Sequence, residues 1–180
     1  MGSSVATPVG RSDLRRLALE VRKLSKTTDQ LFFPIVEFIE LILPKIDPGF
    51  ELEILTREEM GTKHGLTLPD KKCIRLREDV YIRACNNEGR DRLTLAHEVG
   101  HYFLHDSSSV QHARLQPGEE IKAFEDPEWQ ASAFAGELLV PAHLAKGLRP
   151  ADIAYMCGVS NEAALMQYNK IPGNNRRISL

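Results

Sequence analysis

Cysteine is scarce in this sequence of 180 residues, where Cys73, Cys85 and Cys157 are odd in number and far apart. They offer neither a disulfide framework nor the paired spacing of a cysteine zinc finger, and they indicate reduced thiols in a cytoplasmic protein. We expect Cys85 and Cys157 to lie in the core.

Long apolar runs are lacking as well. The apolar stretch 31–44 is too short to cross a bilayer, and it contains Glu37 and Glu40. Residues 1–10 lack the apolar centre of a signal peptide, and we expect them to be disordered. These absences favour a protein that is neither inserted in a membrane nor exported.

An excess of one charge is also missing, since the formal net charge is −2. This balance gives no reason to expect binding to nucleic acid or to a membrane surface. Basic residues do gather in segment 11–26, where six of them outnumber two acidic residues. We interpret this segment as the solvated face of a helix, with a docking surface for an acidic partner as the alternative.

The sequence has no internal repeat, no glycine-rich phosphate loop and no serine-nucleophile motif. What it does contain is His97-Glu98-Val99-Gly100-His101. Positions i and i+4 share one face of a helix, so both imidazoles can reach one metal ion. Zinc suits paired imidazoles, with manganese or iron as alternatives, and three protein ligands leave its fourth position open to water. Glu98 can take a proton from that water.

This spacing requires a helix, and the sequence predicts one over residues 92–105. Asp91 can cap the first turn. An apolar stripe runs along one side of the segment. The stripe consists of Leu93, Ala96, Gly100, Phe103 and Leu104. Because glycine is otherwise a poor helix former, Gly100 indicates that another backbone approaches closely.

A third metal ligand is needed, because two histidines hold zinc poorly. A third histidine six residues after His101 is absent, since Ser107 stands there. Downstream carboxylates offer the other route, and the candidates are Glu119, Glu120, Glu125, Asp126, Glu128 and Glu137.

A second helix is predicted over residues 127–140. Asp126 can cap it, Pro127 suits its first position, and Pro141 ends it. Glu128 continues the inward apolar stripe of this helix one turn toward its start, and therefore points at the partner helix. We choose Glu128 as the third ligand.

Both segments together resemble the ImmA/IrrE family of metallopeptidases. The matching residues are His97-Glu98-x-x-His101 and Glu128-x-x-Ala131-x-x-Phe134-Ala135-x-x-Leu138-Leu139-x-Pro141, and the resemblance is specific over residues 74–141. It implies an α+β, zincin-like domain in which a small twisted sheet packs on the HExxH helix and on a second ligand-bearing helix, with extra N- and C-terminal helices. It also implies that His97, His101 and Glu128 bind zinc and that Glu98 is the general base.

Members of this family, taken as a class, cleave helix-turn-helix repressors, so the resemblance implies a regulatory protein of that kind as substrate. Two departures bear on this expectation. Ser132 stands where the family more often has Asn, and no clear DNA-binding domain accompanies the peptidase segment. The alternative is a zinc-containing regulatory module without proteolysis, such as a repressor-binding sensor or a toxin–antitoxin-like partner. The intact Glu98 argues against that alternative, because a structural zinc site needs no base.

The chain divides into four expected parts. These are a disordered terminus (1–10), N-terminal helices (11–50), a metallopeptidase core (51–147) and a C-terminal helical segment packing on the core (148–180). We expect helices at 12–26, 28–43 and 142–147, strands at 51–55, 72–76 and 79–85, and a mobile loop at 106–122. The alternating strand 79–85 is a candidate edge for pairing with an extended substrate, with a merely structural strand as the alternative.

The C-terminal segment has the outline of a helix-turn-helix over residues 150–170. Its would-be recognition helix, 161–170, carries Glu162 and no arginine, so it lacks the basic footprint of DNA contact. We expect this segment to pack against the core, with no direct binding to nucleic acid.

An oxyanion donor is expected too, because such donors contribute about 3 kcal/mol to the stabilisation of the transition state. The candidates are His105, Tyr81, Tyr102 and His112. For His105, a supporting position beside the ligands or at the edge of the core is the alternative.

Overall fold

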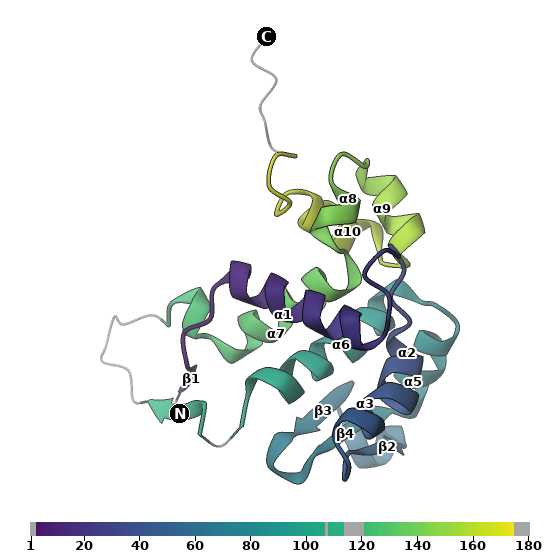
Figure 1. The fold of residues 1–180 in the computed structure, drawn as a ribbon. Helices are drawn as coiled ribbons and strands as arrows, with labels where there is room; N and C mark the ends of the chain where they lie inside the picture. Colours follow the sequence, from purple (N-terminus) through teal and green to yellow (C-terminus); the bar gives the residue numbers. More distant parts are fainter. Residues whose placement is uncertain (1–2, 107, 114–120, 175–180) are drawn as a thin grey trace.

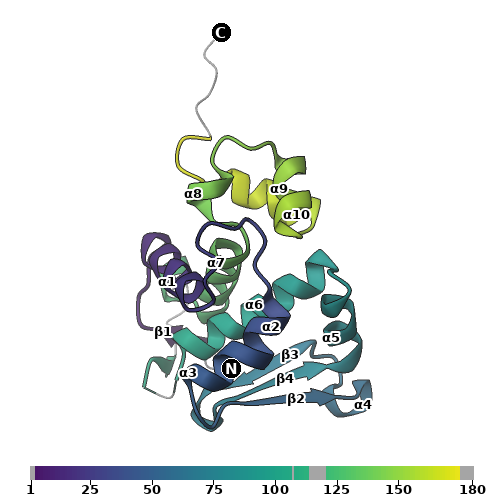
Figure 2. The same cartoon turned by 45° about the vertical axis from the view of Figure 1, so that its right-hand side comes forward.

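Two long helices, α6 (Gly89–Leu104) and α7 (Pro127–Leu139), pack on each other at the centre of the computed structural model (Figure 1). The structure describes residues 3–106, 108–113 and 121–174, and for residues 3 and 111–113 the backbone alone. A small sheet lies on one side of α6, and α7 with α1 (Arg11–Leu24) lies on the other (Figure 2). The fold is α+β with a small sheet, as expected.

The sheet has the strand order β2-β4-β3. Strands β2 (Glu51–Leu55) and β4 (Cys73–Arg77) are parallel, with Glu51 opposite Cys73. Strand β3 (Gly65–Leu68) is antiparallel to β4, with Gly65 opposite Leu76, and it lies at the edge next to α6. The strands expected at 51–55 and 72–76 are confirmed, whereas β3 was not predicted.

The strand expected at 79–85 is wrong, because this segment is the helix α5 (Glu78–Cys85). Val80 and Ala84, one helical turn apart, are buried, while Ile82 is 49% exposed. A strand would have placed Ile82 on the same face as the other two residues. Cys85 is exposed as a result, so its expected place in the core is also wrong, while Cys157 is buried as predicted.

The segment after α1 forms less helix than expected at 28–43. Helix begins at α2 (Ile35–Glu37), continues through the π-helical turn η1 (Phe38–Ile42), and ends with α3 (Leu43–Ile46). Pro44 lies inside α3 and does not end the helix. Proline has no N–H to bond the preceding turn, and the wider η1 turn directly before it accommodates that loss.

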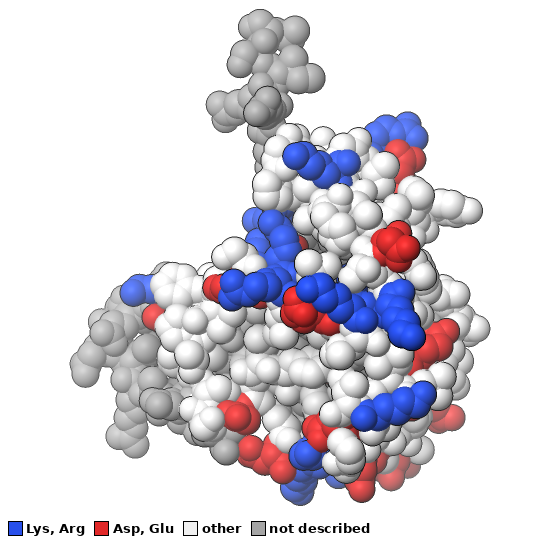
Figure 3. Space-filling model, in the orientation of Figure 1, with Lys and Arg blue, Asp and Glu red and all other residues white. Residues whose placement is uncertain are grey.

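The basic residues of α1 do not all face solvent, because one of them is buried. Arg22 is 1% exposed and donates hydrogen bonds to the carbonyls of Leu138, Thr27 and Gln30 at 2.7 to 2.9 Å. Arg16 and Lys23 pair with Asp13 and Glu20 at 2.8 and 2.7 Å, and basic and acidic residues are interspersed on the face of the protein that Figure 3 shows. The interpretation of 11–26 as a simply solvated face is therefore wrong for its buried arginine.

Residues 3–10 are ordered, contrary to the disorder expected for 1–10, of which residues 1 and 2 fall outside the described part of the chain. Strand β1 (Ser3–Ala6) pairs antiparallel with β5 (Val110–Ala113). The next residue, Thr7, donates its N–H to the Ser109 carbonyl at 2.9 Å. β5 lies within the loop expected at 106–122, of which residues 107 and 114–120 fall outside the described part of the chain.

Short helices complete the chain. They are α4 (Arg57–Met60), α8 (Ala142–Ala145), α9 (Pro150–Cys157) and α10 (Asn161–Tyr168), with 3-10 turns η2 (Pro69–Lys71) and η3 (Ala123–Glu125). Arg92 of α6 joins the C-terminal helices to the core: it is 1% exposed, donates to the Gly158 carbonyl at 2.9 Å and to the Phe33 carbonyl at 2.8 Å. No helix within the described residues has the length and apolar character needed to span a membrane.

Candidate metal centre

Helix α6 carries both histidines of the motif, but it begins earlier than predicted. Glu88 is its N-cap residue, and Asp91 lies inside the first turn, where both of its carboxylate oxygens pair with Arg83 at 2.9 and 3.0 Å. The predicted capping role of Asp91 is therefore wrong, because the arginine occupies its oxygens. The i, i+4 spacing of the motif does fall on the helix.

The buried face of α6 explains how it meets α7. Leu95, Ala96 and Val99 are at most 1% exposed, so the apolar stripe lies partly off the one predicted. A Cβ atom on Gly100 would lie 3.0 Å from Cα of Ala131 in α7. The close approach predicted from this glycine is confirmed, and it brings the two helices near enough for their side chains to share a site.

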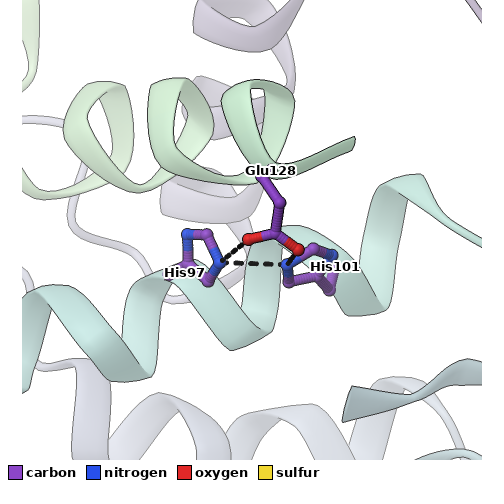
Figure 4. A group of neighbouring side chains, drawn as sticks. All are labelled: His97, His101 and Glu128. Carbon is purple, nitrogen blue, oxygen red and sulfur yellow. Dashed lines mark hydrogen bonds and ion pairs between the residues drawn. The ribbon is translucent and has the colours of Figure 1, made fainter. Parts of the chain in front are cut away.

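The start of α7 places Glu128. The Asp126 side chain accepts a hydrogen bond from the Glu128 N–H at 3.0 Å, and Pro127 occupies the first helical position. This capping arrangement is the predicted one. It sets Glu128 in the first turn, where its side chain points down between the two histidines of α6 (Figure 4).

Three potential ligand atoms converge there. Nε2 of His97 and Nε2 of His101 are 2.9 Å apart, and the Glu128 carboxylate oxygens lie 3.2 and 3.4 Å from them, respectively. All three ligand atoms lie within 4.8 Å of one another, and they form the group of metal-ligating residues found among the described part of the chain. The structure thus brings together the three residues that the sequence singled out.

The geometry fits a metal ion. Tetrahedral zinc with ligand distances near 2.0 to 2.1 Å holds its ligand atoms about 3.3 Å apart, close to the separations seen here. Two imidazole nitrogens facing each other can share only one proton, whereas a cation between them satisfies both lone pairs. The proximity of His101, and next of His97, lowers the pKa of the Glu128 carboxyl, so this side chain is an anion.

A buried hydrogen-bond chain fixes the tautomer of His101. Gln130 of α7 is 1% exposed, and its amide nitrogen donates to the carbonyls of Thr7 and Phe124, both at 2.8 Å. Its oxygen must therefore accept from Nε2 of His105, 2.9 Å away. His105 then accepts through Nδ1 from Nδ1 of His101 at 3.0 Å. This leaves the lone pair of His101 on Nε2, the atom that faces Glu128.

His105 is 6% exposed, and burial is the main cause that lowers its pKa. A neutral ring is what the chain requires, because an imidazolium could not accept from His101. His105 therefore takes the supporting position beside a ligand, and both of its nitrogens are engaged. The candidate role as oxyanion donor does not fit these contacts, whereas the alternative that the sequence analysis gave does.

His97 has a different neighbour. Its Nδ1 lies 3.2 Å from the hydroxyl of Ser132, an exposed residue of α7. A hydroxyl can either donate or accept, so this contact does not fix the tautomer of His97. Ser132, noted in the sequence as a departure from the family pattern, thus touches the ring of a candidate ligand.

Glu98 lies between α6 and the edge strand β3. It is 7% exposed, and the Thr67 hydroxyl is 2.7 Å from its Oε2. A Cβ atom on Gly65 would lie 2.5 Å from its Oε1, so the carboxylate needs glycine at that position. Strand β3 therefore holds the candidate base beside the histidines.

These residues border a cavity of about 330 Å³, lined by His97, Glu98, His101 and Glu128 together with Lys63 and Thr67. Lys63 is the one cationic side chain among the described lining residues. A second cavity of about 440 Å³ continues past His101 and His105 toward β1 and β5. The candidate base, the candidate ligands and a cation thus face one space.

The two tyrosines considered as oxyanion donors do not line this cavity. The hydroxyl of Tyr102 donates to Asp47 at 2.6 Å, and that of Tyr81 donates to Glu40. Both tyrosines are therefore engaged elsewhere, and assigning them as oxyanion donors is wrong. The side chain of His112 lies outside the described part of the structure.

The other described carboxylates that were considered as third ligand are not in the group of His97, His101 and Glu128. Glu137 is 3% exposed and pairs with Arg11 and Arg15 at 3.0 and 2.7 Å, on the side of α7 that faces α1. Asp126 caps α7, and Glu125 precedes it in η3. Glu119 and Glu120 lie outside the described residues.

Sequence reasoning missed the residues that hold the ligands and the base in position. Gln130 gave a usable signal, since a polar residue inside an otherwise apolar helix face needs a buried partner. Gly65, Thr67 and Lys63 gave none, because a strand of four residues is too short to recognise by its pattern.

Comparison with known proteins agrees with this geometry. A family model described as the IrrE N-terminal-like domain, Peptidase M78, matches residues 51–164. Searches of the curated proteins and of the solved structures gave no significant match. The family match covers more than half of the 180 residues and includes the whole of α6 and α7, and the chain therefore belongs to the ImmA/IrrE family.

Proposed function

We propose that this protein is a zinc-dependent endopeptidase in which His97, His101 and Glu128 hold the metal and Glu98 is the general base. One observation carries the proposal: two histidine Nε2 atoms and a carboxylate converge beside a cavity that a buried, held glutamate also lines. Membership of a peptidase family supports it. Manganese or iron could occupy the same donor set.

A zinc ion with three protein ligands supplies Lewis acidity, polarising a peptide carbonyl and lowering the pKa of a water molecule toward about 7. Glu98 takes a proton from the attacking water, whose oxygen bonds to the carbonyl carbon. It then delivers that proton to the amide nitrogen as the C–N bond breaks, so the products are a carboxylate and an amine. The Thr67 hydroxyl, 2.7 Å from Oε2, holds Glu98 in position for both transfers.

Lys63 is our candidate for the oxyanion donor. Its side chain lines the cavity, and no described residue forms an ion pair or a side-chain hydrogen bond with it. An ammonium group there can stabilise the negative charge that develops on the carbonyl oxygen. It replaces the tyrosines and His105, whose polar atoms are engaged elsewhere.

Strand β3 replaces the segment 79–85 as the candidate substrate edge. Among the described residues β3 pairs with β4 alone, so its other edge is available to an extended peptide. Leu66 and Thr67 of β3 line the cavity beside Glu98. A substrate paired there would lie across the reacting groups.

For the substrate we propose a regulatory protein, with a helix-turn-helix repressor as the first class to screen. Family membership supports this choice. Family membership also supports metal-dependent chemistry. Glu98 argues against a non-proteolytic module, because a structural metal site needs no base.

Metal analysis and one substitution test the proposal. We expect about one zinc per chain by elemental analysis, with the metal lost in His97→Ala. Glu98→Gln should keep the zinc and lower turnover at least about 10²-fold, the size of a general-base contribution, in a mass-spectrometric assay on a peptide library. Glu162→Gln, an exposed change on α10, is the matched control and should be fully active. Unchanged cleavage by Glu98→Gln would refute the mechanism, and bound zinc without any cleavage by wild type would favour an interaction module.

A further inference from the structure

Three hollows lie between α6, α7 and α10, with volumes of about 280, 210 and 200 Å³. All three are lined by Ser132, whose hydroxyl is 3.2 Å from Nδ1 of His97. Neighbouring hollows also share Leu93 or Met166, so we treat the three adjoining hollows as one depression that starts at a candidate metal ligand and ends at α10. We name it the α6–α10 groove and define it by Leu93, His97, Ser132, Gly136, Met166 and Lys170.

The middle of the groove is apolar. Its walls include Leu93 of α6, Leu139 of α7 and Met166 of α10. Met166 is 59% exposed, so its side chain is accessible to a partner from this hollow. Methionine also adapts its shape to different apolar groups. The groove can therefore accept apolar side chains of varied shape.

The floor of the groove includes a contact between α7 and α10. A Cβ atom on Gly136 of α7 would lie 1.5 Å from the side-chain amide nitrogen of Gln167 in α10. The Gln167 side chain can lie across α7 at this point because residue 136 has no side chain. The depression thus lies where a glycine of α7 meets a side chain of α10.

The ends of the groove are basic. Arg90 lines the hollow that contains His97, and Arg11 and Lys170 line the hollow at the far end. No aspartate or glutamate is among the described residues that line any of the three hollows. Arg11 is paired with Glu137, whereas Arg90 and Lys170 form no ion pair within the described chain. This distribution is complementary to a segment with acidic ends.

We propose that the α6–α10 groove binds a polypeptide segment of the substrate protein that is apolar at its centre and acidic at both ends. The inference rests on the proposed peptidase function for the nature of the partner, because His97 lines both the groove and the cavity that holds Glu98. A substrate chain leaving the β3 edge reaches the groove at that histidine. The groove then selects the substrate, while the cavity cleaves it.

Binding of a synthetic probe tests the groove without requiring cleavage. The probe is a fluorescein-labelled peptide with a central run of leucine and phenylalanine between ends rich in aspartate and glutamate, titrated into the zinc-loaded Glu98→Gln protein and followed by anisotropy. Met166→Glu should weaken its binding about tenfold or more, because a carboxylate enters an apolar wall next to an acidic ligand. Leu165→Glu is the matched control: this neighbour is 52% exposed and lines none of the hollows, so binding should stay within about twofold.

A second measurement tests the basic ends. A probe with the same centre and lysine-rich ends should bind about tenfold more weakly, and the double change Arg90→Glu with Lys170→Glu should reverse that preference. Both residues are exposed, so folding should be kept, as thermal unfolding can verify. Equal binding of the two probes, or equal effects of Met166→Glu and Leu165→Glu, would overturn the proposal.

Failure of the groove and failure of the peptidase proposal give different results. Cleavage of the peptide library with preferences unchanged by Met166→Glu would remove the groove and leave the peptidase. Binding of the acidic probe that is lost in Met166→Glu, in a protein that cleaves nothing, would keep the groove as a docking site and remove the peptidase.

Discussion

The two halves of the candidate metal centre are supported in different ways. His101 and Glu98 have partners within the protein: the buried His105–Gln130 chain behind one, and the half-buried Thr67 with Gly65 behind the other. His97 has an exposed serine for a neighbour, and the Glu128 side chain is 73% exposed. One half is held by hydrogen bonds within the protein, whereas the other half has an exposed carboxylate and a histidine with an exposed neighbour.

This difference separates two requirements of the same site. A ligand and a base must be held within a fraction of an ångström of the productive geometry, which buried partners achieve. A protein substrate must reach the reacting atoms, which exposed ligands allow. The held half lies beside β3 and the N-terminal segment, and His97 of the open half lines the α6–α10 groove. The following substitutions test whether the two halves differ as much in energy as they do in structure.

The largest effect is expected from Glu128→Ala in the open half. Exposure does not make this carboxylate dispensable, because it is one of the three ligand groups that we propose, so zinc affinity should fall by more than about 10²-fold. Competition with a chromophoric chelator measures the affinity. Glu125→Ala, which removes the neighbouring carboxylate in η3, is the control. Wild-type affinity in Glu128→Ala would assign the third ligand to another residue.

Gln130→Leu should come next, with zinc affinity lowered about 10- to 100-fold. Leucine removes the acceptor that orients His105, so His101 is no longer confined to the tautomer with its lone pair on Nε2. Nitrogen chemical shifts of the labelled histidine in the metal-free protein report that tautomer directly. Gln130→Glu keeps an acceptor for His105 and loses the donors to Thr7 and Phe124. Relative to Gln130→Leu, Gln130→Glu should therefore restore zinc affinity more than it restores thermal stability. That result would show that Gln130 orients His105 in addition to stabilising the fold.

Thr67→Val should lower turnover about tenfold and leave zinc affinity unchanged. The change removes a hydrogen bond to a carboxylate, worth about 1.5 kcal/mol, and keeps the shape of the side chain. Steady-state kinetics should show the loss in kcat, because Glu98 would be less well held for proton transfer. Thr67→Ser should restore most of the rate, and Thr62→Val, at an exposed position before β3, should have no effect. An unaltered rate in Thr67→Val would mean that Glu98 needs no such support.

The smallest effect is expected from Ser132→Ala, which removes the hydroxyl beside His97. Zinc affinity should change less than about threefold, since the contact is exposed and does not fix the tautomer. The same chelator competition measures it. If Ser132→Ala weakens zinc binding as much as Gln130→Leu, the two halves of the site are equally constrained and the comparison fails.

The sequence predicted the ligand-bearing parts of the site because their signals are local. The spacing of His97 and His101 fixes a shared helix face, and Asp126 with Pro127 fixes the start of α7, which in turn orients Glu128. Gly100 indicated the close contact of the two helices. Each of these inferences needed only neighbours within a few turns of helix.

The parts that were missed depend on distant residues or on short segments. Segment 78–85 alternates apolar and polar residues, yet Val80 and Ala84 fit a helix face as well as a strand face, and the packing of α5 against α6 decided between them. Gln130 meets Thr7 across 123 residues of sequence, a pairing that no local pattern encodes. The support of the site is tertiary, so it could not be read from the motif.

The hydrogen bond between Gln130 and the Thr7 carbonyl also determines when, during translation, the site can be completed. Thr7 is synthesised 123 residues before Gln130, which at about 5 to 20 residues per second is an interval of about 6 to 25 s. Until the later residue has left the ribosome, the hydrogen-bond chain behind His101 has no anchor. A growing chain that already carries both histidines therefore lacks the finished metal centre, and the complete site appears only late in translation.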